Sequence, residues 1–191
     1  MPVDVRNEAS QTGLMIACAN NKSCETVKVI LDQSPNLSAE DLQGWTALHY
    51  AAQCGSWECV KLLIANKAEI NATTDKNETA LFLTTKHKHP DIVEFLAENN
   101  CHLQTKALYK KPKKNSWETQ REEDFTALEV AVQHNFAEIA KCLLFHLIRR
   151  NKLNEEQINN LLCIAARDDH TKIAHELVIN GANVNYIGGS I

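Results

Sequence analysis

A repeating pattern of apolar positions predicts pairs of short helices along this chain. It is clearest in residues 44–71, GWTALHYAAQCGSWECVKLLIANKAEIN, where small and branched apolar residues recur at helical spacing on both sides of Gly55. Thr46 is a suitable N-cap for the first helix, because its hydroxyl can accept a backbone N–H that the helix leaves unbonded. Gly55 ends that helix, since glycine adopts the left-handed conformation of a tight turn without a Cβ penalty. Such a pair needs copies on both sides to bury its apolar surface.

Threonines at the predicted N-cap position mark further copies of this pattern. The four clearest copies begin at Thr12, Thr46, Thr79 and Thr126. The intervals between them are 34, 33 and 47 residues, so a period near 33 holds except before the fourth copy. A fifth copy returns in register from Asn160. The sequence therefore predicts five stacked helix pairs, with surplus residues in the connection before the fourth.

The fourth copy departs from the pattern in two ways. No turn signal stops its second helix before Arg150, so we expect this helix to exceed the usual length. Asn154 followed by Gln157 matches a capping box, which predicts a short extra helix in place of the usual loop. The resulting division is 10–43, 44–76, 77–104, 124–157 and 158–191, with an insertion at 105–123.

These features together resemble the ankyrin repeat. The period is near 33 residues, TALHYAA stands in the second copy, TAL opens two others and NGANVN closes the last. The resemblance is weakest in the fourth copy, where Glu129 stands at the position of His49. It implies an all-α solenoid of stacked helix–turn–helix units with β-hairpin fingers, and a concave groove between the fingers and the first helices. It also implies a non-catalytic module that grips another protein.

Composition places the chain among folded intracellular proteins. Of its 191 residues 44% are hydrophobic and 23% charged, with a formal net charge of −4, which is typical of a folded domain. The N-terminus lacks the apolar core of a signal peptide. The seven cysteines are odd in number and lie mostly in helical patterns, which indicates reduced thiols. We therefore expect a cytoplasmic or nuclear protein. The many asparagines and lysines also suit bacteria that deliver ankyrin effectors into a host cytosol.

The sequence contains no motif for catalysis, cofactor or metal binding. A nucleophile elbow, a glycine-rich phosphate loop and a zinc-protease helix are all absent, so we expect no enzyme. His49 could suggest a catalytic or metal-binding role, but the resemblance implies that it bridges neighbouring loops through hydrogen bonds. Cys54 and Cys59 lack a second pair at zinc-finger spacing, so we expect no metal site.

The insertion before the fourth copy concentrates positive charge. Residues 105–121 carry a net charge of about +5 against about −9 for the rest of the chain. Its lysines are Lys106, Lys110, Lys111, Lys113 and Lys114. One interpretation is a solvated finger; the others are a nuclear-import signal, a contact with an acidic partner or phospholipid headgroups, or a nucleic-acid contact with Tyr109 and Trp117 stacking on bases. Nucleic acid is the least favoured, because the body of the chain is acidic.

Positions that differ between copies predict where a partner protein binds. The finger positions, one residue before each N-cap, are Trp45, Glu78 and Phe125. The groove positions, near the end of each first helix, are Gln53, Lys86, His87, Gln133, His134, Arg167 and Asp168. Exposed aromatic residues often anchor interfaces, so Trp45 and Phe125 should face solvent unless a neighbouring finger covers them. We expect a monomer.

The C-terminal residues raise an alternative function. The stretch 186–191, YIGGSI, is similar to the start of another finger that no helix pair follows. We therefore expect the natural protein to continue past Ile191. In that case the module would be the targeting arm of a larger enzyme or bacterial effector, with catalysis outside this chain.

Overall fold

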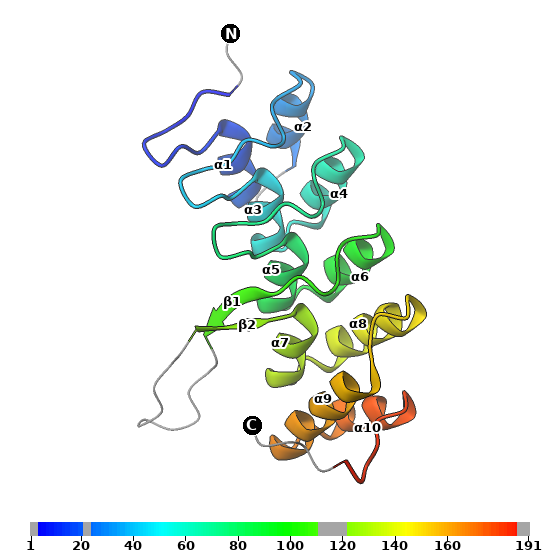
Figure 1. The fold of residues 1–191 in the computed structure, drawn as a ribbon. Coiled ribbons are helices and arrows are strands. Elements are labelled where there is room, and N and C mark those ends of the chain that lie inside the picture. Colours follow the sequence, from blue (N-terminus) through cyan, green and yellow to red (C-terminus); the bar gives the residue numbers. More distant parts are fainter. Residues whose placement is uncertain (1–3, 21–23, 111–121, 187–191) are drawn as a thin grey trace.

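Five helix pairs stacked in order form the architecture of this protein (Figure 1). The computed structural model describes residues 4–20, 24–110 and 122–186. The pairs are α1 (Gly13–Ala19) with α2 (Glu25–Leu31), α3 (Ala47–Cys54) with α4 (Trp57–Ala65), α5 (Ala80–Lys86) with α6 (Pro90–Glu98), α7 (Ala127–Gln133) with α8 (Ala137–Arg149), and α9 (Glu155–Arg167) with α10 (Thr171–Ile179). The predicted all-α solenoid is confirmed.

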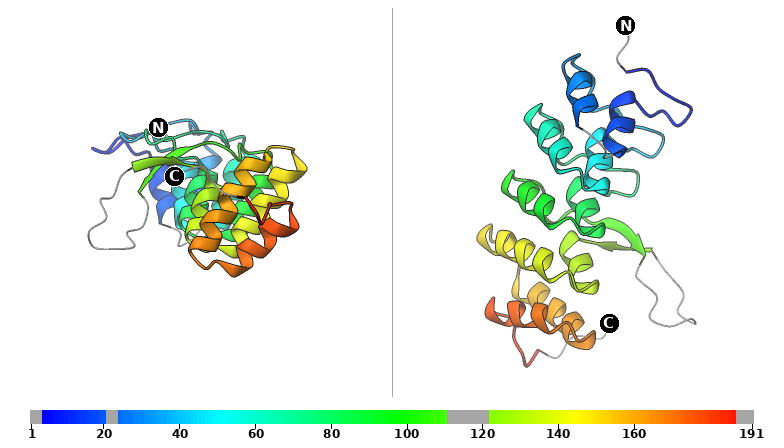
Figure 2. Two further views of the ribbon diagram at one scale, coloured as in Figure 1. Left: turned by 60° about the horizontal axis from the view of Figure 1, so that its bottom comes forward. Right: turned by 180° about the vertical axis from the view of Figure 1, so that it is seen from behind.

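The helices form two layers, which the two views of Figure 2 show from other directions. In the inner layer each first helix packs on the next, from α1 through α3, α5 and α7 to α9. In the outer layer α4 contacts α6, α6 contacts α8, and α8 contacts α10. One apolar core extends through all five pairs, from Leu14 to Ala182. Each pair thus buries its apolar surface against its neighbours, as the repeat pattern requires.

The four threonines predicted to open the first helices are all N-caps. Their backbones are extended, and they precede α1, α3, α5 and α7. In α5 the hydroxyl of Thr79 accepts the backbone N–H of Phe82 at 3.2 Å, and in α7 that of Thr126 accepts the N–H of Glu129 at 3.3 Å. These bonds satisfy donors that a helix start would otherwise leave unpaired, so they fix where each helix begins.

Gly55 is required at the end of α3 for two reasons. Its φ of +69° lies in the left-handed region, which glycine adopts without steric cost. A Cβ at this position would also lie 2.4 Å from the ring of His89. That ring reaches across from the third pair, where Nε2 of His89 lies 3.1 Å from the carbonyl oxygen of Gln53. Glycine therefore allows the second and third pairs to approach closely.

The irregular fourth and fifth pairs confirm one prediction and correct another. Helix α8 has 13 residues, so the predicted overrun is confirmed. The capping box is also present, because the side chain of Asn154 accepts the N–H of Gln157 at 2.8 Å. It opens the 13-residue α9 rather than a separate short helix, so that part of the prediction was wrong. No glycine or proline interrupts Glu155–Arg167, and the apolar face continues through Ile158 and Leu161.

The insertion forms a two-stranded hairpin beside α5 and α7 (Figure 1). Strand β1 (Ala107–Lys110) pairs antiparallel with β2 (Glu122–Phe125), and Ala107 lies opposite Phe125. In the part of the chain that the structure describes, it is the only finger with a regular sheet. None of the helices in the described ranges is long and apolar enough to cross a membrane.

Candidate functional site

The hairpin is anchored by a small apolar cluster of its own. Ala107 and Phe125 are buried with Phe82 of α5 and Val130 of α7, apart from the main core. Tyr109 covers the cluster, with its ring centroid 5.9 Å from that of Phe82 and 6.0 Å from that of Phe125. Ala107 and Tyr109 share one face of β1, because alternate residues of a strand point the same way. The inserted strand is therefore fixed to the first helices of the third and fourth pairs.

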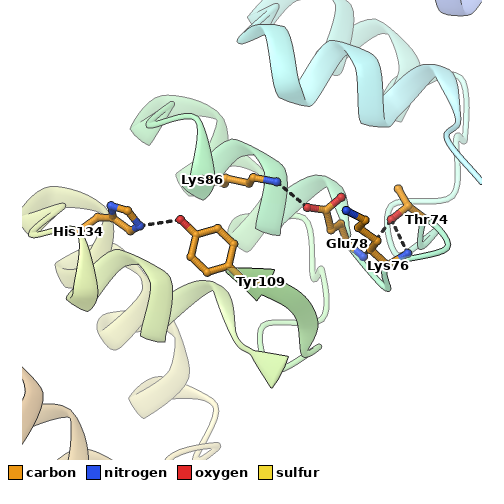
Figure 3. Close-up of polar contacts among 6 residues, drawn as sticks. All are labelled: Thr74, Lys76, Glu78, Lys86, Tyr109 and His134. Atoms are coloured by element: carbon orange, nitrogen blue, oxygen red, sulfur yellow. Dashed lines mark hydrogen bonds and ion pairs between the residues drawn. The ribbon is translucent and has the colours of Figure 1, made fainter. Parts of the chain in front are cut away.

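A line of polar side chains crosses this region on the finger side of α5 and α7 (Figure 3). The hydroxyl of Tyr109 lies 2.6 Å from Nε2 of His134. The Nζ of Lys86 lies 2.8 Å from Oε1 of Glu78 and 5.9 Å from the centroid of the Tyr109 ring. We call these four residues, Glu78, Lys86, Tyr109 and His134, the groove row. It joins a finger, two first helices and the hairpin into one surface.

The groove row holds an uncharged tyrosine–histidine pair at neutral pH. Burial, and then the nearby charge of His170, lower the pKa of His134. Burial raises the pKa of Tyr109. The Tyr109 hydroxyl is therefore the donor and Nε2 of His134 the acceptor, which places the ring proton of His134 on Nδ1. The charges of the row are those of Lys86 and Glu78, which pair with each other.

Two predicted finger residues are buried. Glu78 is only 3% exposed, and its backbone N–H donates to Oγ1 of Thr74 at 3.2 Å while its carboxylate turns toward Lys86. Phe125 is 6% exposed because Tyr109 and its neighbours cover it. Neither side chain has the exposed surface that direct contact with a partner would need. Glu78 instead holds the ammonium group of Lys86, and Phe125 packs under the ring of Tyr109.

Trp45 is half-buried, and its own repeat covers it. Its ring centroid lies 5.1 Å from that of Tyr50 and 6.1 Å from that of His49, both in α3. Asp41 fixes the turn, since one carboxylate oxygen accepts the Trp45 N–H at 2.9 Å and the other accepts the Tyr50 hydroxyl at 2.5 Å. Trp45 therefore keeps an open edge but is not a free finger tip.

His49 has the structural role that the resemblance implied. Its Nδ1 accepts the backbone N–H of Thr46 at 3.0 Å, and its Nε2 lies 2.9 Å from the carbonyl oxygen of Ala72 in the next connection. Because Nδ1 is an acceptor, the ring proton is on Nε2 and donates to Ala72. The residue is 1% exposed, and burial lowers its pKa.

The remaining predicted groove residues are spread over four pairs. Lys86, His87 and Arg167 are exposed, and Gln53, Gln133, His134 and Asp168 are half-buried. The structure brings Lys86 and His134 together through Tyr109, whereas Gln53 lies in the second pair. In the fifth pair Arg167 and Asp168 form an ion pair with each other at 3.1 Å. In the sequence analysis Tyr109 was considered only as a residue that could stack on bases. Ala107 and Tyr109 are two positions apart, and in a strand this spacing predicts that the two side chains share one face.

The described stem of the insertion is not basic. Lys106 and Lys110 are exposed, but Nζ of Lys110 lies 3.5 Å from Glu122, and β2 adds two further acids. Opposite charges thus face each other along the stem. Four residues of the basic-loop prediction, and the last five of the chain, lie outside the described residues: Lys111, Lys113, Lys114, Trp117 and 187–191.

The outer layer has a second concave surface. A groove of about 950 Å³ lies between α6 and α8. Glu94 and Glu98 line one side, Lys141 and Arg149 line the other, and Phe145 stands between them with 59% of its surface exposed. The groove follows α6 and α8 from their first turns to their ends. The described ranges contain no group of three or more metal-ligating side chains placed to hold a metal ion.

Comparison with known proteins gives consistent matches. The family model described as ankyrin repeats (3 copies) matches residues 14–107 and 66–154. Ankyrin repeat domain-containing protein 37 of Homo sapiens is 34% identical over 85 residues, 44% of this chain and 53% of that protein. Ankyrin repeat and SOCS box protein 2 of Bos taurus is 37% identical over 75 residues, 39% of this chain and 12% of that protein. The chain thus matches about half the length of the first relative and a small part of the second.

Proposed function

This chain belongs to the ankyrin-repeat family, and we propose that it is a non-catalytic recognition module that binds another protein on its concave face. Ankyrin repeats are generally protein–protein interaction modules. The proposed contact surface combines the accessible part of the groove row with the exposed residues beside it: Lys86, His87, Tyr109 and His134. Gln53, Gln133, Arg167 and Asp168 would extend the contact toward the two ends of the stack.

The pre-organisation of the groove row is the observation that carries this proposal. Glu78 holds the ammonium group of Lys86, and His134 holds the hydroxyl of Tyr109. Side chains already fixed in one conformation lose less entropy on binding. Tyrosine is also among the residue types that dominate interface energies. The row thus combines a rigid aromatic surface with one cation, which suits a partner segment carrying an acidic residue beside an apolar one.

Affinity measurements on matched variants test the proposal. Lys86→Gln keeps a hydrogen bond to Glu78 but removes the cation, and we expect it to weaken binding of the purified natural partner by about tenfold. Phe145→Ala in the outer groove is the control and should leave the affinity unchanged. A loss confined to Phe145→Ala would overturn the proposal and assign binding to the outer face. Thermal melts of both variants show whether either loss reflects unfolding.

Neutralising the insertion distinguishes the groove from the basic loop. Replacing Lys111, Lys113 and Lys114 with serine should leave partner affinity and its salt dependence nearly unchanged. A large loss with a steep salt dependence would instead assign binding to an acidic protein, phospholipid headgroups or nucleic acid. The acidic strand β2 beside Lys110 supports the first outcome.

The relatives favour a second candidate, in which the same surface recruits a partner to a larger protein. In the bovine relative the matched segment is 12% of a protein whose name also includes a SOCS box. The surface would then be a targeting arm, and any catalysis would belong to another part of the natural protein. Its mass on a denaturing gel decides between the two, since an isolated module would migrate near 21.4 kDa.

A further inference from the structure

Two cysteines of the first and second helix pairs lie in sulfur-to-sulfur contact. The Sγ atoms of Cys24, the N-cap of α2, and Cys59, in α4, are 3.0 Å apart. All seven cysteines of the chain are reduced thiols in the structure. A disulfide bond is about 2.0 Å long, so an approach of about 1 Å would bring the two sulfur atoms to bonding distance.

The environment of Cys59 favours a thiolate. Hydrogen bonds from Cys18, and then from Cys24 and Ser56, lower the pKa of Cys59 to about 6 against the opposing effect of burial. Partial burial and the hydrogen bond to Cys59 raise the pKa of Cys24 to about 11. The two pKa shifts have opposite directions, so Cys59 is the thiol that ionises more readily and Cys24 the one that keeps its proton. Thiolates are the reactive form of cysteine.

Accessibility gives the two cysteines different roles. Cys24 is half-buried and reaches the surface, whereas Cys59 is 1% exposed and Cys18 is completely buried. An oxidant in solution can meet Cys24 first, and Cys59 is positioned behind it. Sensitive thiols in proteins are commonly arranged in this way, with an accessible cysteine beside a resolving one. The Cys59 thiolate next to Cys24 can accept the proton that Cys24 loses when it reacts.

We propose that Cys24 and Cys59 form a redox-active pair, which hydrogen peroxide converts to a disulfide joining α2 to α4. This inference is independent of the partner-binding proposal. The proposed modification site lies in the first and second helix pairs, whereas the hairpin packs against the third and fourth pairs.

The chemistry proceeds in two balanced steps. The Cys59 thiolate takes the proton of Cys24 as the sulfur of Cys24 attacks the O–O bond of hydrogen peroxide and becomes a sulfenic acid, and the departing hydroxide takes a proton from solvent to form water. The sulfur of Cys59 then attacks the sulfenic sulfur, the S–O bond breaks, and the leaving hydroxide takes the proton of Cys59 to form a second water. In total two thiols and one hydrogen peroxide give one disulfide and two waters. Each sulfur loses one electron, and the peroxide gains two.

The bond would tie the first pair to the second. The α1/α2 pair packs on the second pair through the contact of α1 with α3. Cys24 and Cys59 are 35 positions apart, so a bridge would close a long loop in the unfolded chain. Oxidation should therefore stabilise this end of the stack.

Peptide mapping tests the assignment. The full chain is treated with one equivalent of hydrogen peroxide, alkylated, and digested with trypsin and a glutamyl endopeptidase, which cuts after Glu58 and so separates Cys54 from Cys59. We expect a linked Cys24–Cys59 peptide and a protein lighter by two hydrogen atoms, both reversed by dithiothreitol. Cys24→Ser should abolish the link. Cys163→Ser, in α9, is the matched control and should retain it.

Thermal melts give an independent readout. Oxidised wild type and oxidised Cys163→Ser should melt roughly 5–10 °C higher than their reduced forms, and Cys24→Ser should show no such difference. A bond from Cys24 or Cys59 to Cys18 or Cys54, or full alkylation of Cys24 after peroxide treatment, would overturn the proposal. Should a variant fail to fold, the wild-type digest still decides, because it identifies the linked residues directly.

Discussion

Trp45 and Phe125 occupy the same position of the repeat, one residue before an N-cap threonine, yet their surroundings differ. Trp45 is half-buried against Tyr50 of its own helix. Phe125 is 6% exposed, because the inserted strand brings Tyr109 over it. Position within a repeat therefore does not determine burial. In the fourth pair the inserted strand of the same finger covers the side chain.

Because of this difference, the second and fourth pairs expose different side chains. In the second pair the aromatic ring of the finger residue is only half-buried, so one edge stays open. In the fourth pair the finger residue is part of a small core, and the hairpin presents Tyr109 beside Lys86 of α5 instead. In the fourth pair the insertion thus buries a finger position that is half-open in the second pair.

Alanine at each of the two positions tests the comparison most strongly. Phe125→Ala should lower the free energy of unfolding by about 3 kcal/mol, because it empties the cluster under the hairpin. Trp45→Ala should cost about 1 kcal/mol, since it loses mainly aromatic contacts at a half-buried site. Chemical denaturation followed by circular dichroism measures both. Equal losses would contradict the distinction between a core residue and a partly open one.

Removing the hydroxyl group of Tyr109 tests how much its hydrogen bond contributes to the fourth pair. Tyr109→Phe should lower the free energy of unfolding by about 1 kcal/mol, because Nε2 of His134 loses its donor. The ring stays in place over Phe125, so the hairpin should remain folded. Tyr50→Phe is the matched change in the second pair, where the hydroxyl bonds Asp41. If only Tyr50→Phe altered partner binding, the open edge at Trp45 would be the more important surface.

The smallest expected effect concerns pH. Burial lowers the pKa of His49, so the unfolded chain binds a proton more readily than the folded one. Stability from this residue should be complete above the unfolded pKa of about 6.5 and be lost as pH falls from there toward the folded value. His49→Gln should therefore flatten the loss of stability between pH 7.5 and 5.5. Glu129→Gln, at the same position of α7, replaces no imidazole and should leave that slope unchanged.

Local patterns predicted most of the fold. The threonine caps and apolar spacing of the first helices depend on neighbouring residues, and the structure confirms them at Thr12, Thr46, Thr79 and Thr126. The capping box at Asn154 was predicted, but the length of α9 was missed, because the fifth copy was expected to begin in register at Asn160. The helix instead begins after Asn154 and continues without interruption through Asn160 to Arg167.

The candidate site was less predictable because it depends on contacts between distant segments. Burial of Phe125 and the bond from Tyr109 to His134 require the inserted strand to return to α7. Repeat position alone cannot show this. The contact of Cys24 with Cys59 is similar, since it joins the N-cap of one second helix to the side of the next.

Site-specific photo-crosslinking tests the central claim, that the concave face near the groove row binds the partner, most directly. A benzophenone amino acid replaces His87 on the concave side in one version and Phe145 in the outer groove in another; both positions are exposed. After irradiation in an extract that contains the natural partner, we expect a covalent adduct from position 87 and none from position 145. An adduct from position 145 alone would contradict the account.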